Sequence, residues 1–121
     1  MASTLAPTRT GLYLYGITLA DHVLFPLRGV GGADVELIVE GSLAAIVSQL
    51  GVDKVRPQRA NLAAHHRILH DLAEQRPVLP VVFGTITGND GELRRVLRRN
   101  QDTLARLLDR LRGKVEMGLK V

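Results

Sequence analysis

The sequence has no cysteine in its 121 residues, which excludes disulfides and metal sites built on thiolates. It also has no tryptophan and only two tyrosines and two phenylalanines. No apolar run approaches the ~20 residues of a membrane-spanning helix. The N-terminal stretch MASTLAPTRT lacks the apolar segment of a secretory signal. These absences predict a soluble, cytoplasmic protein without a membrane anchor.

The length favours one domain, because a chain of this size can bury a single stable core. Residues 1–10 are small and polar and contain Pro7. We expect them to form a disordered tail. The domain then covers residues 11–121.

Three segments in the first half of the chain have the pattern of strands. The segment from Leu12 to Ile17 is apolar at almost every position, as in a strand buried on both faces. Val35 to Glu40 alternates between apolar and polar residues, Gly41-Ser42 fits a two-residue turn, and residues 43–50 return the chain. The pattern predicts a single strand followed by a hairpin.

Two long helices are predicted in the second half. The first covers about residues 58–75, between Pro57 and Pro77. The second begins at Asn89, whose spacing from Glu92 is that of a capping box. It carries one apolar stripe from residue 93 to residue 111, and Gly113 is placed as its C-terminal cap. Residues 114–121 then alternate as a final strand.

Between the helices, the stretch VLPVVFGT places Pro80 inside an apolar run. Proline has no backbone N–H and is excluded from the middle of a central strand. We therefore expect pairing to begin near Val81, with Pro80 at the first position of the strand. Gly84 indicates a bulge or a close backbone approach.

The element order is strand, two-stranded hairpin, helix, strand, helix, strand. It predicts an α+β fold, a two-layer ferredoxin-like sandwich with a five-stranded mixed sheet and both long helices on one face. The uncovered face of the sheet would then expose apolar side chains, Tyr13 and Tyr15 among them. A large exposed apolar patch marks an interface, so these tyrosines are predicted to bind a partner or a second copy of the chain.

Positive charge is concentrated in the second of these helices. Between Glu92 and Arg112 there are seven arginines and three acidic residues, and the excess of four equals the net charge of the whole chain. A partner that recognises charge should therefore contact this helix. The candidate interface residues here are Arg94, Arg95, Arg98 and Arg99.

No arrangement of residues indicates catalysis, a metal or a cofactor. His66 and His70 share a helix face, but Arg67 stands where a metalloprotease helix has glutamate, and no third ligand follows at the right spacing. The glycines from Gly29 to Gly32 have neither the Rossmann nor the P-loop spacing. The sequence therefore predicts a protein that is not an enzyme.

Three segments in order resemble the gas vesicle protein F/L family: NLAAHHRILHDL, RPVLPVVFGT and LLDRLRGKVEMGLKV. The opening LYLYGI is also similar to the usual start of that family. Val82 departs from the pattern, because the family usually carries arginine there. The residues that match the motifs are Ala64, His65, Ile68, Leu69, Val78, Leu79, Pro80, Phe83, Gly84, Thr85, Gly113, Lys114, Glu116, Gly118, Lys120 and Val121.

The resemblance implies an accessory or minor structural protein of gas vesicles in the cytoplasm. Such a protein would act in vesicle assembly by binding the shell protein and other gas vesicle proteins, without cofactors or enzyme activity. Family members usually continue into a second, helical domain, so the resemblance implies that this chain is the N-terminal domain.

Two other functions are compatible with the residues. One is a ferredoxin-like regulatory domain in which the loop from Gly29 to Gly32 closes over a small ligand. The other is an RNA-binding module that uses the four arginines. RNA binding is the weaker alternative, because the aromatic-glycine signature of an RNA-recognition strand is absent.

Overall fold

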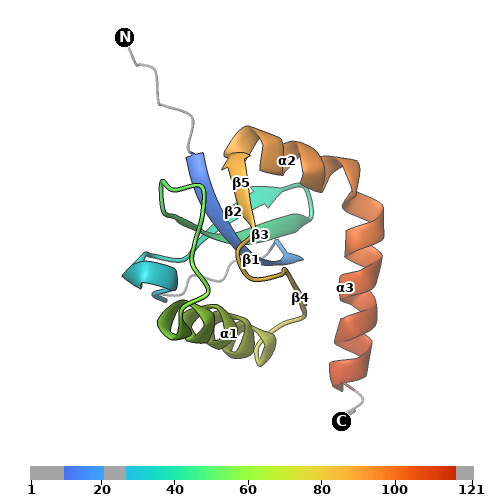
Figure 1. Cartoon of the computed structure of the whole chain (residues 1–121). Helices are drawn as coiled ribbons and strands as arrows, with labels where there is room; N and C mark the ends of the chain where they lie inside the picture. Colours follow the sequence, from blue (N-terminus) through green and yellow to red (C-terminus); the bar gives the residue numbers. More distant parts are fainter. Residues whose placement is uncertain (1–9, 21–26, 117–121) are drawn as a thin grey trace.

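The computed structural model describes residues 10–20 and 27–116 (Figure 1). The predicted N-terminal tail falls almost wholly outside the described residues, as does the part of the predicted final strand beyond Glu116. The elements, in chain order, are β1 (Thr10–Leu19), the short 3-10 helix η1 (Val30–Gly32), β2 (Glu36–Glu40), β3 (Leu43–Gln49), α1 (Arg59–Ala73), β4 (Val78–Pro80), β5 (Ile86–Asn89), α2 (Asp90–Arg99) and α3 (Gln101–Glu116).

The five strands form one sheet in the order β2-β3-β1-β4, and β5 pairs with the same edge of β1 that β4 uses. The predicted hairpin is confirmed: Glu40 pairs with Leu43 across the turn of Gly41 and Ser42. Every strand pair is antiparallel, so the mixed sheet predicted from the sequence is wrong. The α+β class and a five-stranded sheet are confirmed, but the fifth strand is β5; of the predicted final strand, residues 114–116 belong to α3.

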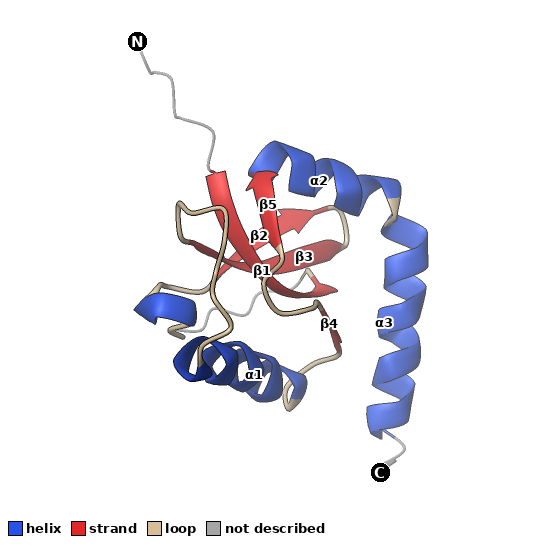
Figure 2. Ribbon diagram, in the orientation of Figure 1, coloured by secondary structure: helices blue, strands red, loops and turns tan. Residues whose placement is uncertain are grey.

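Both faces of β1 are buried, as its apolar sequence predicts. Leu12 and Leu14 belong to a core cluster with Leu93, Leu97 and Leu108 from α2 and α3. The alternate residues of β1 belong to a second cluster, which contains Ala64, Ile68 and Leu72 of α1. Figure 2 shows α1 on one side of the sheet and α2 and α3 on the other.

The prediction of two helices on one face is therefore wrong, and so is the uncovered sheet face that followed from it. The continuous apolar run of β1 requires an apolar layer on each side, because neighbouring side chains of a strand point to opposite faces. The chain supplies both layers itself.

The proline-containing segment forms an interrupted edge strand. Val78, Leu79 and Pro80 pair with Thr18, Ile17 and Gly16, and pairing resumes from Ile86. Pro80 thus ends β4 rather than beginning a strand near Val81, and it is tolerated because this strand lies at the edge of the sheet. Between the two paired parts, Gly84 has φ 91°, a conformation that favours glycine. The strand is interrupted over residues 81–85, which is a longer break than the predicted bulge, and nothing lies within 4 Å of a Cβ added at Gly84, so the alternative of a close backbone approach is also wrong.

The predicted second long helix is two helices. Asn100 interrupts it: its backbone N–H and its side-chain Nδ2 both donate to Val96 O, at 3.2 Å and 2.8 Å. Asparagine competes with the helical backbone in this way. The start of α2 is as predicted, since Glu92 N donates to Asn89 Oδ1 at 2.8 Å. Gly113 is not a C-terminal cap, because α3 continues to Glu116.

Candidate functional site

The family-motif residues of three separate segments meet in one buried cluster. His65 of α1 is 2% exposed, and its Nδ1 lies 2.8 Å from the hydroxyl of Tyr13 on β1. The ring centroid of Phe83 lies 5.5 Å from His65 and 6.0 Å from Tyr13. Gly84 N donates to the Tyr13 hydroxyl at 3.1 Å. The cluster therefore joins α1, β1 and the segment between β4 and β5.

Burial changes the acid–base behaviour of this cluster. Removal from water lowers the pKa of His65 below its ordinary value, since the charged imidazolium loses hydration. Burial also raises the pKa of Tyr13, because its phenolate would be poorly solvated. Both residues are therefore held in their neutral forms. The hydroxyl of Tyr13 and the imidazole of His65 form a buried pair, so the arrangement offers structural hydrogen bonds rather than an accessible catalytic pair.

A second network of hydrogen bonds surrounds Tyr15. Its hydroxyl lies 2.8 Å from Ser48 Oγ and accepts a hydrogen bond from Val30 N at 2.9 Å. Ser48 Oγ donates in turn to Asp34 O at 2.8 Å. These bonds fix the loop that carries Gly29 against the sheet, so this loop is packed rather than free to close over a ligand.

The prediction that Tyr13 and Tyr15 form an exposed interface is wrong. Both side chains are 0% exposed, because α1 and the Gly29 loop cover the face of the sheet from which they project. Their role is to connect elements within the domain.

The four arginines of α2 divide into two pairs. Arg94 Nη1 donates to Val39 O at 2.6 Å, and Arg98 Nε donates to Glu40 Oε2 at 3.0 Å. Both guanidinium groups are therefore engaged with the β2–β3 hairpin. Arg94 and Arg98 attach α2 to the sheet, which reduces what they can offer to a partner.

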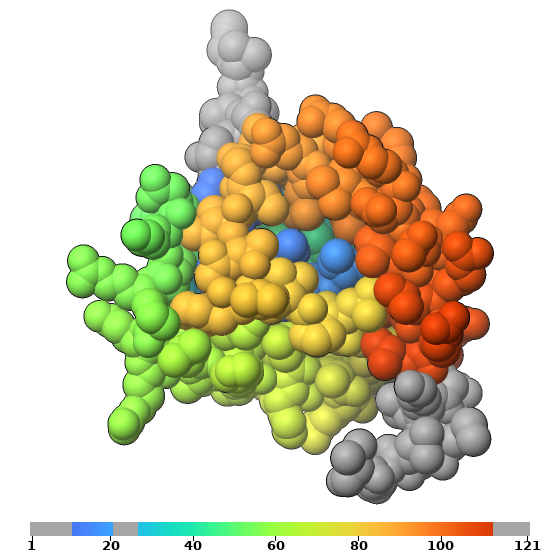
Figure 3. All heavy atoms as spheres, turned by 45° about the vertical axis from the view of Figure 1, so that its right-hand side comes forward, coloured from blue at the N-terminus to red at the C-terminus, as the bar shows by residue number. Residues whose placement is uncertain are grey.

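Arg95 and Arg99 form the outward pair. Both are exposed, and their i,i+4 spacing places them on one face of α2. In the described part of the chain neither has an ion-pair partner. Two apolar residues of the helical layer are also exposed, Val96 by 48% and Leu107 by 38%. Figure 3 shows α2 and α3, in orange and red, forming a continuous part of the surface beside the yellow segment around β4.

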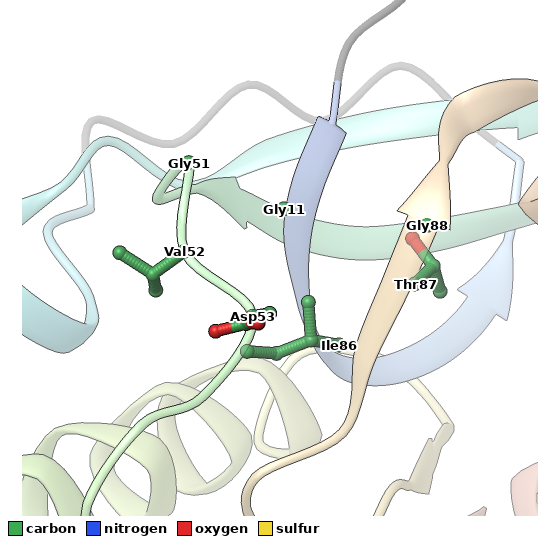
Figure 4. Close-up of a pocket in the computed structure, with 7 residues that line it drawn as sticks. All are labelled: Gly11, Gly51, Val52, Asp53, Ile86, Thr87 and Gly88. Atoms are coloured by element: carbon green, nitrogen blue, oxygen red, sulfur yellow. The ribbon is translucent and has the colours of Figure 1, made fainter.

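A surface groove of about 600 Å³ was not predicted from the sequence. Its walls come from β5 and from the loop after β3 (Figure 4). Asp53 is the one charged residue among the groove-lining residues that the structure describes, and its side chain is exposed. The lining residues are Gly11, Gly51, Val52, Asp53, Ile86, Thr87 and Gly88. This lining offers little to fix a ligand in one orientation.

The histidine pair on α1 lies at the surface. His66 and His70 are exposed, and His70 lies 3.6 Å from Asp71 and 3.7 Å from Glu74. Within the described ranges, no three potential metal ligands come together. No described helix has both the length and the apolar character needed to cross a membrane.

The remaining motif residues are placed by the same fold. Leu79 and Pro80 belong to β4, and Thr85 O accepts from Leu14 N at 3.0 Å. Gly113 and Glu116 lie in α3. Gly118 lies outside the described residues.

The family model for gas vesicle synthesis protein GvpL/GvpF matches residues 11–121. Gas vesicle protein F of Streptomyces sp. is 35% identical over 112 residues, which are 89% of this chain and 47% of that protein. Gas vesicle protein L of the same organism is 30% identical over 123 residues, 90% of this chain and 46% of that protein. Gas vesicle protein F1 of Halobacterium salinarum is 32% identical over 116 residues, 91% and 54% respectively. The chain spans about half the length of the curated relatives it matches.

Solved structures of gas vesicle proteins have the same fold. The gas vesicle protein GvpF from Anabaena sp. PCC7120 superposes with a TM-score of 0.72 at 26% identity, over 84% of this chain and 44% of that one. GvpF from Microcystis aeruginosa has a TM-score of 0.74 at 22% identity, over 84% and 43%, and supports the fold alone. The chain belongs to the gas vesicle protein family GvpL/GvpF.

Proposed function

We propose that this protein acts as an accessory component in gas vesicle assembly, by binding the shell protein and other gas vesicle proteins. The family match over residues 11–121 supports the gas vesicle role. The outward surface of α2 is the observation that carries the binding role, because it combines exposed apolar area with two arginines that have no ion-pair partner among the described residues.

The contacts of α2 explain why Arg95 and Arg99, rather than all four arginines, are the proposed binding residues. Arg94 and Arg98 are already bound to the hairpin through Val39 and Glu40. A guanidinium without an internal partner can donate to carboxylates of another protein, often through two parallel hydrogen bonds. Val96 lies between Arg95 and Arg99 in the sequence and adds apolar contact. The proposed partner surface is therefore acidic with an apolar area beside it.

The test is co-purification of the tagged full-length chain with the shell protein after co-expression. Arg95→Glu combined with Arg99→Glu should reduce recovery of the shell protein at least about tenfold, because both charges would then repel an acidic partner. Arg56→Glu combined with Arg59→Glu is the matched control. It changes the charge by the same amount at exposed positions next to or in α1.

Equal recovery with both double variants would contradict the proposed surface. If neither the wild type nor any variant recovers the shell protein, the proposed partner is wrong. Circular dichroism must show that each variant keeps the native helix content.

A further inference from the structure

The hydrogen bonds around His65 determine its tautomer. Its Nε2 lies 3.0 Å from Val81 O. A carbonyl oxygen only accepts, so Nε2 must carry the hydrogen. In a neutral imidazole the other nitrogen is then an acceptor, and the Tyr13 hydroxyl must donate to Nδ1.

The bonds therefore form a directed chain. Gly84 N–H donates to the Tyr13 oxygen, Tyr13 O–H donates to His65 Nδ1, and His65 Nε2–H donates to Val81 O. Both ends of this chain of hydrogen bonds, Gly84 and Val81, lie in the segment between β4 and β5. One neutral histidine thus holds two points of this segment against the core.

The segment held in this way displays an apolar side chain. Val82 is 79% exposed, while its neighbours are anchored: Val81 N donates to Tyr15 O at 3.0 Å, and Leu14 N donates to Thr85 O at 3.0 Å. Thr85 Oγ1 also donates to Val82 O at 2.7 Å. These backbone anchors do not involve His65, whereas the bond from Gly84 N to the Tyr13 hydroxyl belongs to the chain of hydrogen bonds through His65.

We propose that residues 82–84 form a pH-sensitive latch, which holds Val82 at the surface while His65 is neutral and is released when His65 is protonated. Protonation places a hydrogen on Nδ1, so the Tyr13 oxygen would face two donors, Gly84 N–H and Nδ1–H. Its own hydrogen would lose its acceptor. The charge would also be buried, which is costly unless it is paired.

The groups that face His65 do not compensate that charge. From β1 these groups are Tyr13 and Tyr15, and from α1 the group is His66, whose ring centroid lies 5.7 Å away. Protonated His66 would repel a charged His65. The segment 81–85 itself contributes no titratable side chain. The lowered pKa of His65 agrees with this geometry.

The latch can be tested by NMR on the full chain. At pH 7.5 the ¹⁵N shifts of His65 should be those of the Nε2–H tautomer. Between pH 7.5 and pH 5, the amide of Gly84 should lose protection from hydrogen exchange, after correction for the intrinsic rate. The equilibrium constant for opening of the latch should rise as His65 is protonated. The rise is about tenfold for each unit by which the pKa of His65 is lower in the closed form than in the open form. Amides of β3, such as that of Ile46, should keep their protection.

The variant His65→Gln distinguishes release of the latch from general unfolding of the protein at low pH. A glutamine amide can donate to Val81 O and accept from Tyr13 without titrating, so the pH dependence at Gly84 should disappear. An Nδ1–H tautomer, or constant protection of Gly84 down to pH 5 in the wild type, would overturn the proposal. If His65→Gln does not fold, the tautomer and the exchange profile of the wild type still decide it.

Discussion

Gly29 provides a sharp test of how the tyrosine network stabilises the fold. A Cβ added at this position would overlap the hydroxyl oxygen of Tyr15, and it would lie 3.2 Å from Ser48 Oγ. Tyr15 is fully buried and cannot swing into solvent. Gly29→Ala must therefore displace the loop or the Tyr15 ring.

The cost follows from what either displacement breaks. Forcing an extra methyl group into a packed core costs roughly 1–3 kcal/mol. If Tyr15 moves, Val30 N loses its 2.9 Å hydrogen bond, and an unpaired buried N–H costs about 1–3 kcal/mol more. We expect Gly29→Ala to lower the free energy of unfolding by roughly 2–5 kcal/mol.

Urea unfolding measures this change in the free energy of unfolding. An unchanged m value would indicate that the variant differs from the wild type in stability alone. Tyr15→Phe removes the overlapped oxygen but leaves Cζ, which would lie 2.7 Å from the added Cβ. Because most of the overlap is relieved, the double variant should be less destabilised than the sum of the single variants by at least about 1 kcal/mol. Gly31→Asn is the control. Gly31 has φ 67° and nothing within 4 Å of an added Cβ, a conformation that asparagine tolerates. A stability of Gly29→Ala within about 0.5 kcal/mol of the wild type, or additive single effects, would refute the reasoning.

The other predictions use the same urea measurement. Leu97→Ala should lower the free energy of unfolding by about 2–5 kcal/mol, because Leu97 is fully buried between α2 and the sheet. Val96→Ala, at a half-exposed position, should stay within about 0.5 kcal/mol of the wild type. Equal losses in the two variants would contradict the assignment of the buried face of α2. Asn89→Ala should cost about 1 kcal/mol through loss of the cap to Glu92 N, and no loss would show that water replaces that bond. Arg98→Ala should cost less than about 1 kcal/mol, because the Arg98 side chain is 66% exposed and solvent screens its ion pair with Glu40, whose side chain is 20% exposed; a larger loss would mean that this pair is a main attachment of α2.

Much of the local structure could be predicted from particular residues. The alternation from Val35 to Glu40 and the glycine turn predicted the hairpin, and the Asn89–Glu92 spacing predicted the start of α2. The limits of α1 followed from the prolines on either side. These predictions succeed because capping, turn and pairing preferences act within a few residues of the chain.

The candidate site could be predicted only in part. His65 and Phe83 were identified by resemblance, but their contact with Tyr13 required the packing of α1 on β1. The division of the arginines into bound and outward pairs depended on where Glu40 lies relative to α2. The groove beside β5 left no pattern in the sequence, because its walls come from segments about 35 residues apart.

The α+β class, the burial of β1 on both faces and the family of this protein follow from the amino-acid sequence. They depend on apolar runs, turn residues and motifs that are present in any conformation of the chain. Which element covers each face of the sheet follows only from the packing of the folded chain. That choice depends on the break at Asn100, which turns one predicted helix into two and lets both pack on the face opposite α1. With both faces covered within the chain, the tyrosines became core residues, and the exposed charge and apolar area remained on the helical layer.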